Sequence, residues 1–139
     1  MKVMLEHGAK MPAREHARDA GLDLFANEGA SIPSHSAVTI RTGVHVQLPH
    51  GTAGLLVSKS GLNSKMHITT TGLIDEGYRG EIQVTMHNHG NAPFIVVPGQ
   101  KISQLVIIPV LYEECEKVYK LDESPDGRGE DGFGSTGRF

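Results

Sequence analysis

The chain has 139 residues, a mass of 15.0 kDa, a formal net charge of −3 and a pI near 6.2. This length fits one domain, and the mild negative charge excludes the strongly basic surface of a general nucleic-acid or membrane-surface binder. Seventeen glycines, seven prolines and short β-branched apolar runs exclude a helical bundle and favour an all-β sandwich or barrel.

Cysteine content and apolar runs bear on where the protein works. Cys115 is the single cysteine and cannot form an intrachain disulfide, which favours a reducing compartment. The N-terminus carries no apolar signal region, and no run approaches the roughly 18 apolar residues of a membrane span. We therefore expect a soluble cytoplasmic protein, in the host cytoplasm if viral, without a membrane partner. Aromatic residues make up 5% and tryptophan is absent, so no direct nucleic-acid binding is expected.

The first half of the chain reads as a series of short strands. They are predicted at residues 2–7, 20–26, 36–40, 43–48 and 53–57, the last buried on both faces. Asp23 falls in the middle of the second strand, where an edge-strand charge or a capped turn would explain it as well as a functional role. Residues 58–65 predict a short helix with Ser58 or Ser60 as N-cap, and Lys59 beside these hydroxyls suits an anion as well as a plain cap.

Residues 66–86 predict a β-hairpin, because a β-branched run is followed by Ile82, Val84 and Met86 alternating with polar residues. Asp75 and Tyr78 lie near its bend, where Gly77 and Gly80 are expected to supply backbone freedom. An aspartate at a hairpin bend usually bonds local amides. The local pattern alone therefore does not assign Asp75 a chemical role.

The remaining strands are predicted at residues 94–97, 101–111 and 115–121. Gln104 in the most apolar of them needs partners for its amide, as a structural bridge or as a ligand contact. We expect residues 1–121 to form the β-domain and residues 122–139 a flexible, glycine-rich C-terminal arm. The arm combines a guanidinium, a ring and hydroxyls, which suits closing over a base and a phosphate chain.

Other kinds of site have weaker support. His87 and His89 could share a strand face, but no third ligand has zinc spacing. The chain has no Gly-x-Ser-x-Gly elbow and no glycine-rich phosphate loop of the known kinds. Asp75 and Asp23 could join Lys59, Ser60, Gln104 and Arg128 in metal-assisted phosphoryl chemistry, although spacing alone does not show that they meet.

Five stretches together resemble the five ordered motifs of the homotrimeric all-β dUTPases, the deoxyuridine 5′-triphosphate nucleotidohydrolases. They are residues 20–24, 58–62, 72–80, 98–105 and 128–137. The resemblance implies a distorted jelly-roll barrel, little helix, and a homotrimer whose active sites lie between subunits. It also implies Mg²⁺-assisted hydrolysis of dUTP to dUMP and pyrophosphate by water attack on the α-phosphate. That activity limits uracil incorporation into DNA and supplies dUMP for dTMP synthesis.

The resemblance implies residue roles as well. Asp75 would activate the attacking water, Tyr78 would pack under the deoxyribose, and Asp23 would hold a water on Mg²⁺. The other expected substrate-binding residues are Lys59, Ser60, Gly61 and Gln104 at the phosphates, Thr69, Gly72 and Gln83 at the uracil, and Arg128, Phe133, Gly134, Ser135 and Thr136 on the arm. The uracil would be read largely by the hairpin backbone, including that of Gly72 and Gln83. Two positions depart from the family pattern, since Lys59 replaces the usual arginine and Thr69 stands near a frequent asparagine.

Two rival functions have weaker support. A dCTP deaminase would carry a glutamate ten residues after Asp75, where this chain has Thr85, which cannot shuttle a proton. The alternative from another class is a non-catalytic or regulatory nucleotide-binding β-trimer, since a fold does not fix a function. Retention of Asp75, Tyr78 and the arm argues against it.

Overall fold

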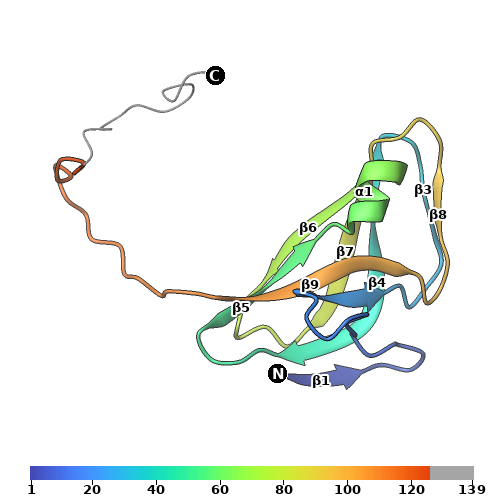
Figure 1. The fold of residues 1–139 in the computed structure, drawn as a ribbon, viewed down its shortest axis with the longest axis horizontal. Helices are drawn as coiled ribbons and strands as arrows, with labels where there is room; N and C mark the ends of the chain where they lie inside the picture. The colour runs from blue at the N-terminus through green and yellow to red at the C-terminus, as the bar shows by residue number, and fades with distance from the viewer. Residues whose placement is uncertain (126–139) are drawn as a thin grey trace.

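The structure of the protein is a computed structural model that describes residues 1–125. Its main sheet has seven antiparallel strands in the order β1-β4-β7-β6-β5-β9-β2 and curls around the core (Figure 1). The strands are β1 (Lys2–Leu5), β2 (Gly21–Phe25), β4 (Ser36–Gln47), β5 (Thr52–Val57), β6 (Ile68–Ile74), β7 (Glu81–Asn88) and β9 (Lys101–Pro109). Within the described residues one short helix, α1 (Ser60–Met66), precedes β6. The all-β fold class is confirmed.

A second, two-stranded sheet pairs β3 (Ala30–Ile32) with β8 (Phe94–Val96). Asn88, only 2% exposed, joins this small sheet to the main one. Its Nδ2 donates to the carbonyl oxygens of Ile32 and Pro33 at 3.0 and 3.2 Å and of Ala92 at 2.8 Å, while its Oδ1 accepts the Gly90 N–H at 2.9 Å. A buried amide with this many partners fixes the loops around it.

The core forms where alternate residues of the curled sheet face inward. Its fully buried members include Leu24, Ile40, Ile82, Val84, Met86, Ile102 and Leu105. The period-2 pattern of the sequence therefore predicted the buried face of β7, because strand side chains alternate between faces.

The predicted elements and the structure differ in three places. The strands expected at 36–40 and 43–48 are one strand, β4, with a register shift between Arg41 and Val44. Gly43 at this bulge has φ +65, which explains how the strand continues through the irregularity. The strand β3 was not predicted, and residues 115–121 form no strand.

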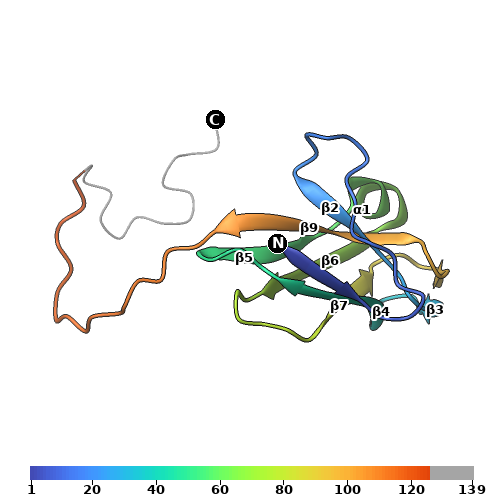
Figure 2. The same ribbon diagram turned by 90° about the horizontal axis from the view of Figure 1, so that it is seen from below.

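After β9 the chain leaves the body of the sheet. Figure 1 and Figure 2 both show the segment as an extended chain that projects away from the strands. Its large apolar side chains are open to solvent, with exposed fractions of 84% for Leu111 and 80% for Leu121. Among residues 1–125 no other strand pairs with residues 115–121, so the strand predicted there lacks a neighbour for its backbone hydrogen bonds. Among the described residues no helix is long and apolar enough to span a membrane.

Candidate active site

The bend between β6 and β7 holds the first group of predicted site residues. The Tyr78 N–H donates to the Asp75 carbonyl at 3.0 Å and closes the turn, leaving Asp75 exposed. A cavity of about 230 Å³ opens beside it and is lined by Leu73, Ile74, Asp75, Tyr78, Glu81 and Gln83. The structure thus brings together the predicted base, the predicted sugar contact and one predicted uracil contact.

Tyr78 is fixed at this bend by a hydrogen bond and by close packing against Gly80. Its hydroxyl donates to the Glu81 carbonyl at 3.0 Å. A Cβ added to Gly80 would lie 2.3 Å from the Tyr78 Oη and 2.5 Å from its Cζ. Neither Gly80 nor Gly77 has a positive φ, so the expectation that they supply backbone freedom was wrong. Gly80 instead makes room for the tyrosine ring.

Glu76 follows Asp75 directly, and its side chain anchors the loop that carries Asp75. Sequence reasoning missed this role. Its carboxylate contacts His50 Nδ1 at 2.9 Å and accepts the Gly51 N–H at 2.9 Å and the Tyr112 hydroxyl at 2.7 Å. These hydrogen bonds, the one to His50 first, lower the pKa of Glu76 to about 2. The loop is therefore tied to the β4–β5 turn and to the segment after β9. No local sequence signal marks these partners, which lie 26 and 36 residues away.

The other two predicted uracil contacts lie on β6 itself. Gly72 pairs with Leu56 in the ladder, and a Cβ there would come 3.1 Å from the Leu56 Cδ1. Thr69 lies further from the bend, and its hydroxyl contacts His89 Nε2 at 2.8 Å. The His89 ring stacks on His87. Thr69 does not line the cavity that holds Asp75.

The second group of predicted residues gathers where β2, β9 and β5 run side by side. Asp23 pairs with Gln104 in the β2–β9 ladder, and Gln104 also pairs with Val57 of β5. The Asp23 carboxylate is nearly buried and forms ion pairs with Lys59 and, at 2.8 Å, with Lys101. Burial raises the pKa of Asp23, but hydrogen bonds from Lys101 and Lys59 outweigh it and hold the pKa below its usual range.

Ser60 and Gly61 lie in the first turn of α1, directly after Lys59. The predicted N-cap was wrong, because Lys59 occupies that position without a side-chain capping bond. Ser58 instead braces β6: its hydroxyl donates to the Thr70 carbonyl at 3.0 Å and accepts the Thr70 N–H at 2.9 Å. A backbone partner across the sheet satisfies that hydroxyl better than the short helix does.

The two groups stand at opposite ends of the β5–β6 ladder. Ile74, just before Asp75, pairs with Gly54, whereas Lys59 lies five residues further along the chain than Gly54. At the rise of an extended strand this corresponds to roughly 15 Å. Within one chain, Asp75 and the Asp23–Lys59 pair are therefore too far apart to contact the same atom of a ligand.

The donor atoms near Asp23 bear on how a magnesium ion could be held. Among the described residues no three His, Cys, Asp or Glu side chains come together to hold a metal. Asp23 offers an ionised carboxylate, the ligand type that Mg²⁺ prefers, but both its oxygens already meet lysines. These residues fit a hydrated ion held mainly by substrate phosphates, and they do not fit an all-protein cage. The arm residues Arg128, Phe133, Gly134, Ser135 and Thr136 lie outside the described residues.

Comparison with known proteins gives the same family from sequence and from structure. The dUTPase family model matches residues 7–137. The deoxyuridine 5′-triphosphate nucleotidohydrolase of Crocosphaera subtropica is 43% identical over 138 residues, covering 97% of this chain and 96% of the relative. The chain belongs to the dUTPase family.

Solved structures of this family have the same fold. The Staphylococcus bacteriophage 80alpha dUTPase with dUPNHPP has a TM-score of 0.91 and 33% identity, covering 98% of this chain and 97% of that one. A point-mutant dUTPase from phage phi11 of S. aureus, described with a structural Mg(II) ion, has a TM-score of 0.82 and 30% identity, covering 87% and 97%. The family, the fold class and the enzyme class expected from the five motifs are confirmed, and a non-catalytic β-trimer is not favoured.

Proposed function

We propose that this chain hydrolyses dUTP to dUMP and pyrophosphate with Asp75 as the general base. The observation that carries the proposal is the cavity of about 230 Å³ that Asp75 shares with Tyr78 and Gln83. In this reaction the Asp75 carboxylate accepts a proton from a water molecule as the water oxygen bonds to the α-phosphorus. The bond from that phosphorus to the bridging oxygen then breaks, and pyrophosphate leaves.

The cavity walls supply the selectivity. Tyr78 packs under the deoxyribose, and its fixed hydroxyl leaves no room for a 2′-hydroxyl. The hairpin backbone, including that of Gly72 and Gln83, would read the uracil, and Thr69 would contribute from further along β6. A narrow pocket with fixed donors and acceptors rejects a mismatched base more strongly than it rejects an extra methyl group.

The second group binds the phosphates. Ser60 and Gln104 contact the inner phosphates, and the Gly61 amide and the Lys59 ammonium assist them. A Cβ on Gly61 would meet nothing within 4 Å, so this chain's own packing does not require glycine there. A close approach of the backbone to a ligand would require it. Asp23 would hold Mg²⁺ through water, and the ion would supply charge neutralisation on the triphosphate.

A homotrimer resolves the distance between the two groups. Asp75 of one protomer would meet the Asp23–Lys59 pair of another across a subunit boundary, and their separation along the β5–β6 ladder within one chain supports this arrangement. The arm residues Arg128, Ser135 and Thr136 would bind the γ-phosphate, while Phe133 beside Gly134 would stack on the uracil. A dCTP deaminase is disfavoured, since the Thr85 hydroxyl shares a 2.8 Å hydrogen bond with Thr39 on the sheet face.

The test is pyrophosphate release from purified protein with Mg²⁺, offered dUTP, dCTP, dTTP and UTP separately. We expect release from dUTP alone. Asp75→Asn should lower turnover by about 10²–10⁴-fold while nucleotide binding persists. The matched control is Asp19→Asn, whose carboxylate accepts the His16 N–H in a separate loop and should leave turnover unchanged. Near-normal turnover in Asp75→Asn would refute its role as the base.

A further inference from the structure

The loop between β6 and β7 is tied to β4 at the end that leads into β7. The Arg79 carbonyl oxygen accepts a hydrogen bond from the His45 Nδ1 at 3.0 Å. His45 lies on β4 and pairs in the ladder with Glu81, the first residue of β7. Near Asp75, the same loop is anchored by the Glu76 carboxylate. Side chains therefore hold this loop at both of its ends.

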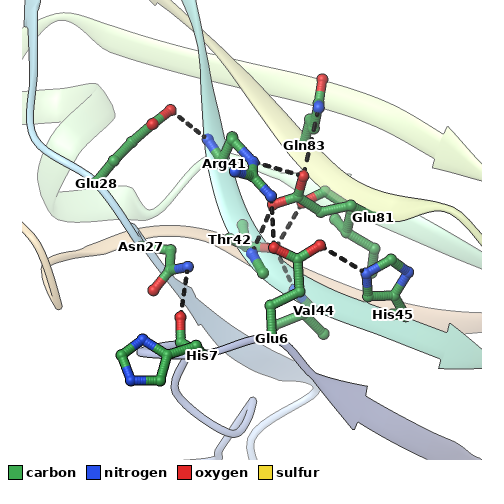
Figure 3. Close-up of polar contacts among 12 residues, drawn as sticks. Glu6, His7, Asn27, Glu28, Arg41, Thr42, Val44, His45, Glu81 and Gln83 are labelled. Atoms are coloured by element: carbon green, nitrogen blue, oxygen red, sulfur yellow. Dashed lines mark hydrogen bonds and ion pairs between the residues drawn. The ribbon is translucent and has the colours of Figure 1, made fainter.

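The other nitrogen of the His45 ring meets a carboxylate. The His45 Nε2 contacts the Glu6 Oε1 at 3.1 Å, and Figure 3 shows Glu6 reaching toward both this ring and Arg41. Arg41 pairs with the second oxygen of Glu6, and its Nε donates to the Glu81 Oε2 at 2.9 Å. The Glu6 carboxylate is thus fixed from two sides. The His45 side chain is 18% exposed, so the ring is largely shielded from water.

The two partners of the ring define its protonation state. A carbonyl oxygen and a carboxylate both accept hydrogen bonds, and neither donates one. A neutral imidazole donates from one nitrogen only, so the two bonds form together only on the charged imidazolium ring. The hydrogen bond to Arg79, followed by that to Glu6, outweighs burial and raises the pKa of His45 above its ordinary value of 6.5.

The other charges that face the ring also favour the imidazolium form. Glu6 and Glu81 are the anions, and both raise the pKa of His45. The cations are Arg41, which pairs with both carboxylates, and Lys2 and Arg79, which line a cavity of about 300 Å³ with His45. The Arg79 guanidinium donates to two carbonyl oxygens of its own loop, at 2.7 and 2.8 Å.

We propose that His45 is a positioning residue for dUTP hydrolysis: its charged ring holds the Arg79 carbonyl and thereby the peptide bond between Arg79 and Gly80. This inference rests on the proposed function. Gly80 makes room for the Tyr78 ring, whose hydroxyl donates to the Glu81 carbonyl. A shift of the Arg79–Gly80 peptide therefore displaces Tyr78, the residue expected under the deoxyribose. Loss of the His45 proton at higher pH removes one of the two hydrogen bonds and loosens the loop.

The experiment compares two substitutions of similar shape in the full-length protein. His45→Asn keeps a donor, because its amide nitrogen is as many bonds from the backbone as the histidine Nδ1, whereas His45→Leu keeps none. We expect kcat/KM for dUTP to fall about tenfold in His45→Leu, less than the ~100-fold loss from a 1 Å misplacement, because Glu76 still anchors the loop. His45→Asn should recover most of this loss. The control is His7→Leu, since His7 is exposed and its carbonyl, not its ring, bonds Asn27.

The pH profile distinguishes positioning from a merely structural role. In the wild type, kcat/KM should fall toward the level of His45→Leu as the pH rises through the pKa of His45. This fall should be missing in His45→Asn, because no ring titrates there. Glu6→Gln removes the anion beside the ring, so its fall should move to lower pH. This variant keeps the test decisive if His45→Leu does not fold.

Several outcomes would overturn the inference while the proposed function stands. They are a wild-type kcat/KM in folded His45→Leu, an equal loss in His45→Asn or in His7→Leu, and a wild-type pH profile in both His45→Asn and Glu6→Gln. Absence of dUTP hydrolysis in the folded wild-type protein would overturn both the inference and the proposed function.

Discussion

Replacing Gly80 by alanine should damage the active site without unfolding the protein. Gly80 follows the loop that carries the proposed base Asp75, and a Cβ there would lie 2.3 Å from the Tyr78 Oη and 2.9 Å from its Cε2. Ordinary van der Waals contact begins near 3.4 Å, so the ring must move by about 1 Å. That displacement breaks the hydrogen bond from the Tyr78 hydroxyl to the Glu81 carbonyl.

The magnitude follows from where Tyr78 lies. A shift of about 1 Å in a substrate-positioning group costs about 10²-fold in turnover efficiency. Stability should change little, because Tyr78 is 43% exposed and its ring can swing into solvent. We therefore expect kcat/KM for dUTP to fall about 100-fold and UTP to be excluded less well, while the melting temperature stays within about 3 °C of the wild type.

The assay is steady-state pyrophosphate release with dUTP and UTP, alongside thermal unfolding. Gly77→Ala is the matched control, since it lies in the same loop, lacks a positive φ, and its Cβ would meet nothing within 4 Å. It should behave as the wild type does. If Gly80→Ala kept a wild-type kcat/KM for dUTP, the idea that Gly80 makes room for a functional Tyr78 would be refuted.

Three further predictions concern stability, pH and phosphate binding. Asn88→Ala removes a buried amide with four hydrogen-bond partners, so the free energy of unfolding should fall by about 2–3 kcal/mol and the melting temperature by about 7–10 °C. The control Asn91→Ala, at an exposed position, should lower the melting temperature by less than about 2 °C. Equal melting temperatures for the two variants would contradict this. Because the pKa of Glu76 is lowered to about 2, its carboxylate stabilises the folded protein above about pH 4.5 and loses this effect as the pH falls toward about 2. The difference in melting temperature between the wild type and Glu76→Gln should therefore narrow over that range. A difference that does not change with pH would rule this out. Lys59→Arg adds a planar fork and should lower KM for dUTP a few-fold with kcat unchanged; an unchanged KM would show that the fork gains nothing here.

The sequence predicted the structure correctly where a local hydrophobic period determines it. Alternation in β7 predicted its buried face, and the hairpin placed Asp75 and Tyr78 at one bend, because side chains on a strand repeat every two residues. The ordered motifs predicted the family for the same reason, since each is a short local pattern. Of the predicted hairpin residues, the cavity brings together Asp75, Tyr78 and Gln83 but not Thr69 or Gly72.

Other features depend on partners far away in the chain. The three-residue strand β3 exists because it pairs with β8, more than 60 residues later, and one buried residue, Ile32, is too little signal to predict it. Ser58 does not cap the helix as expected, because its hydroxyl donates to the Thr70 carbonyl instead. The anchors of Glu76 and Glu81 come from other strands and loops, so only the folded chain reveals them.

The separation of the two residue groups along β5 and β6 has a genetic consequence. If each site takes Asp75 from one protomer and Gln104 from another, a chain defective at Asp75 and a chain defective at Gln104 are each inactive alone. Co-expressed, they would assemble mixed oligomers in which roughly a quarter of the sites are intact. Two damaged alleles would then restore dUTP hydrolysis together. A site contained within one chain would show no such complementation.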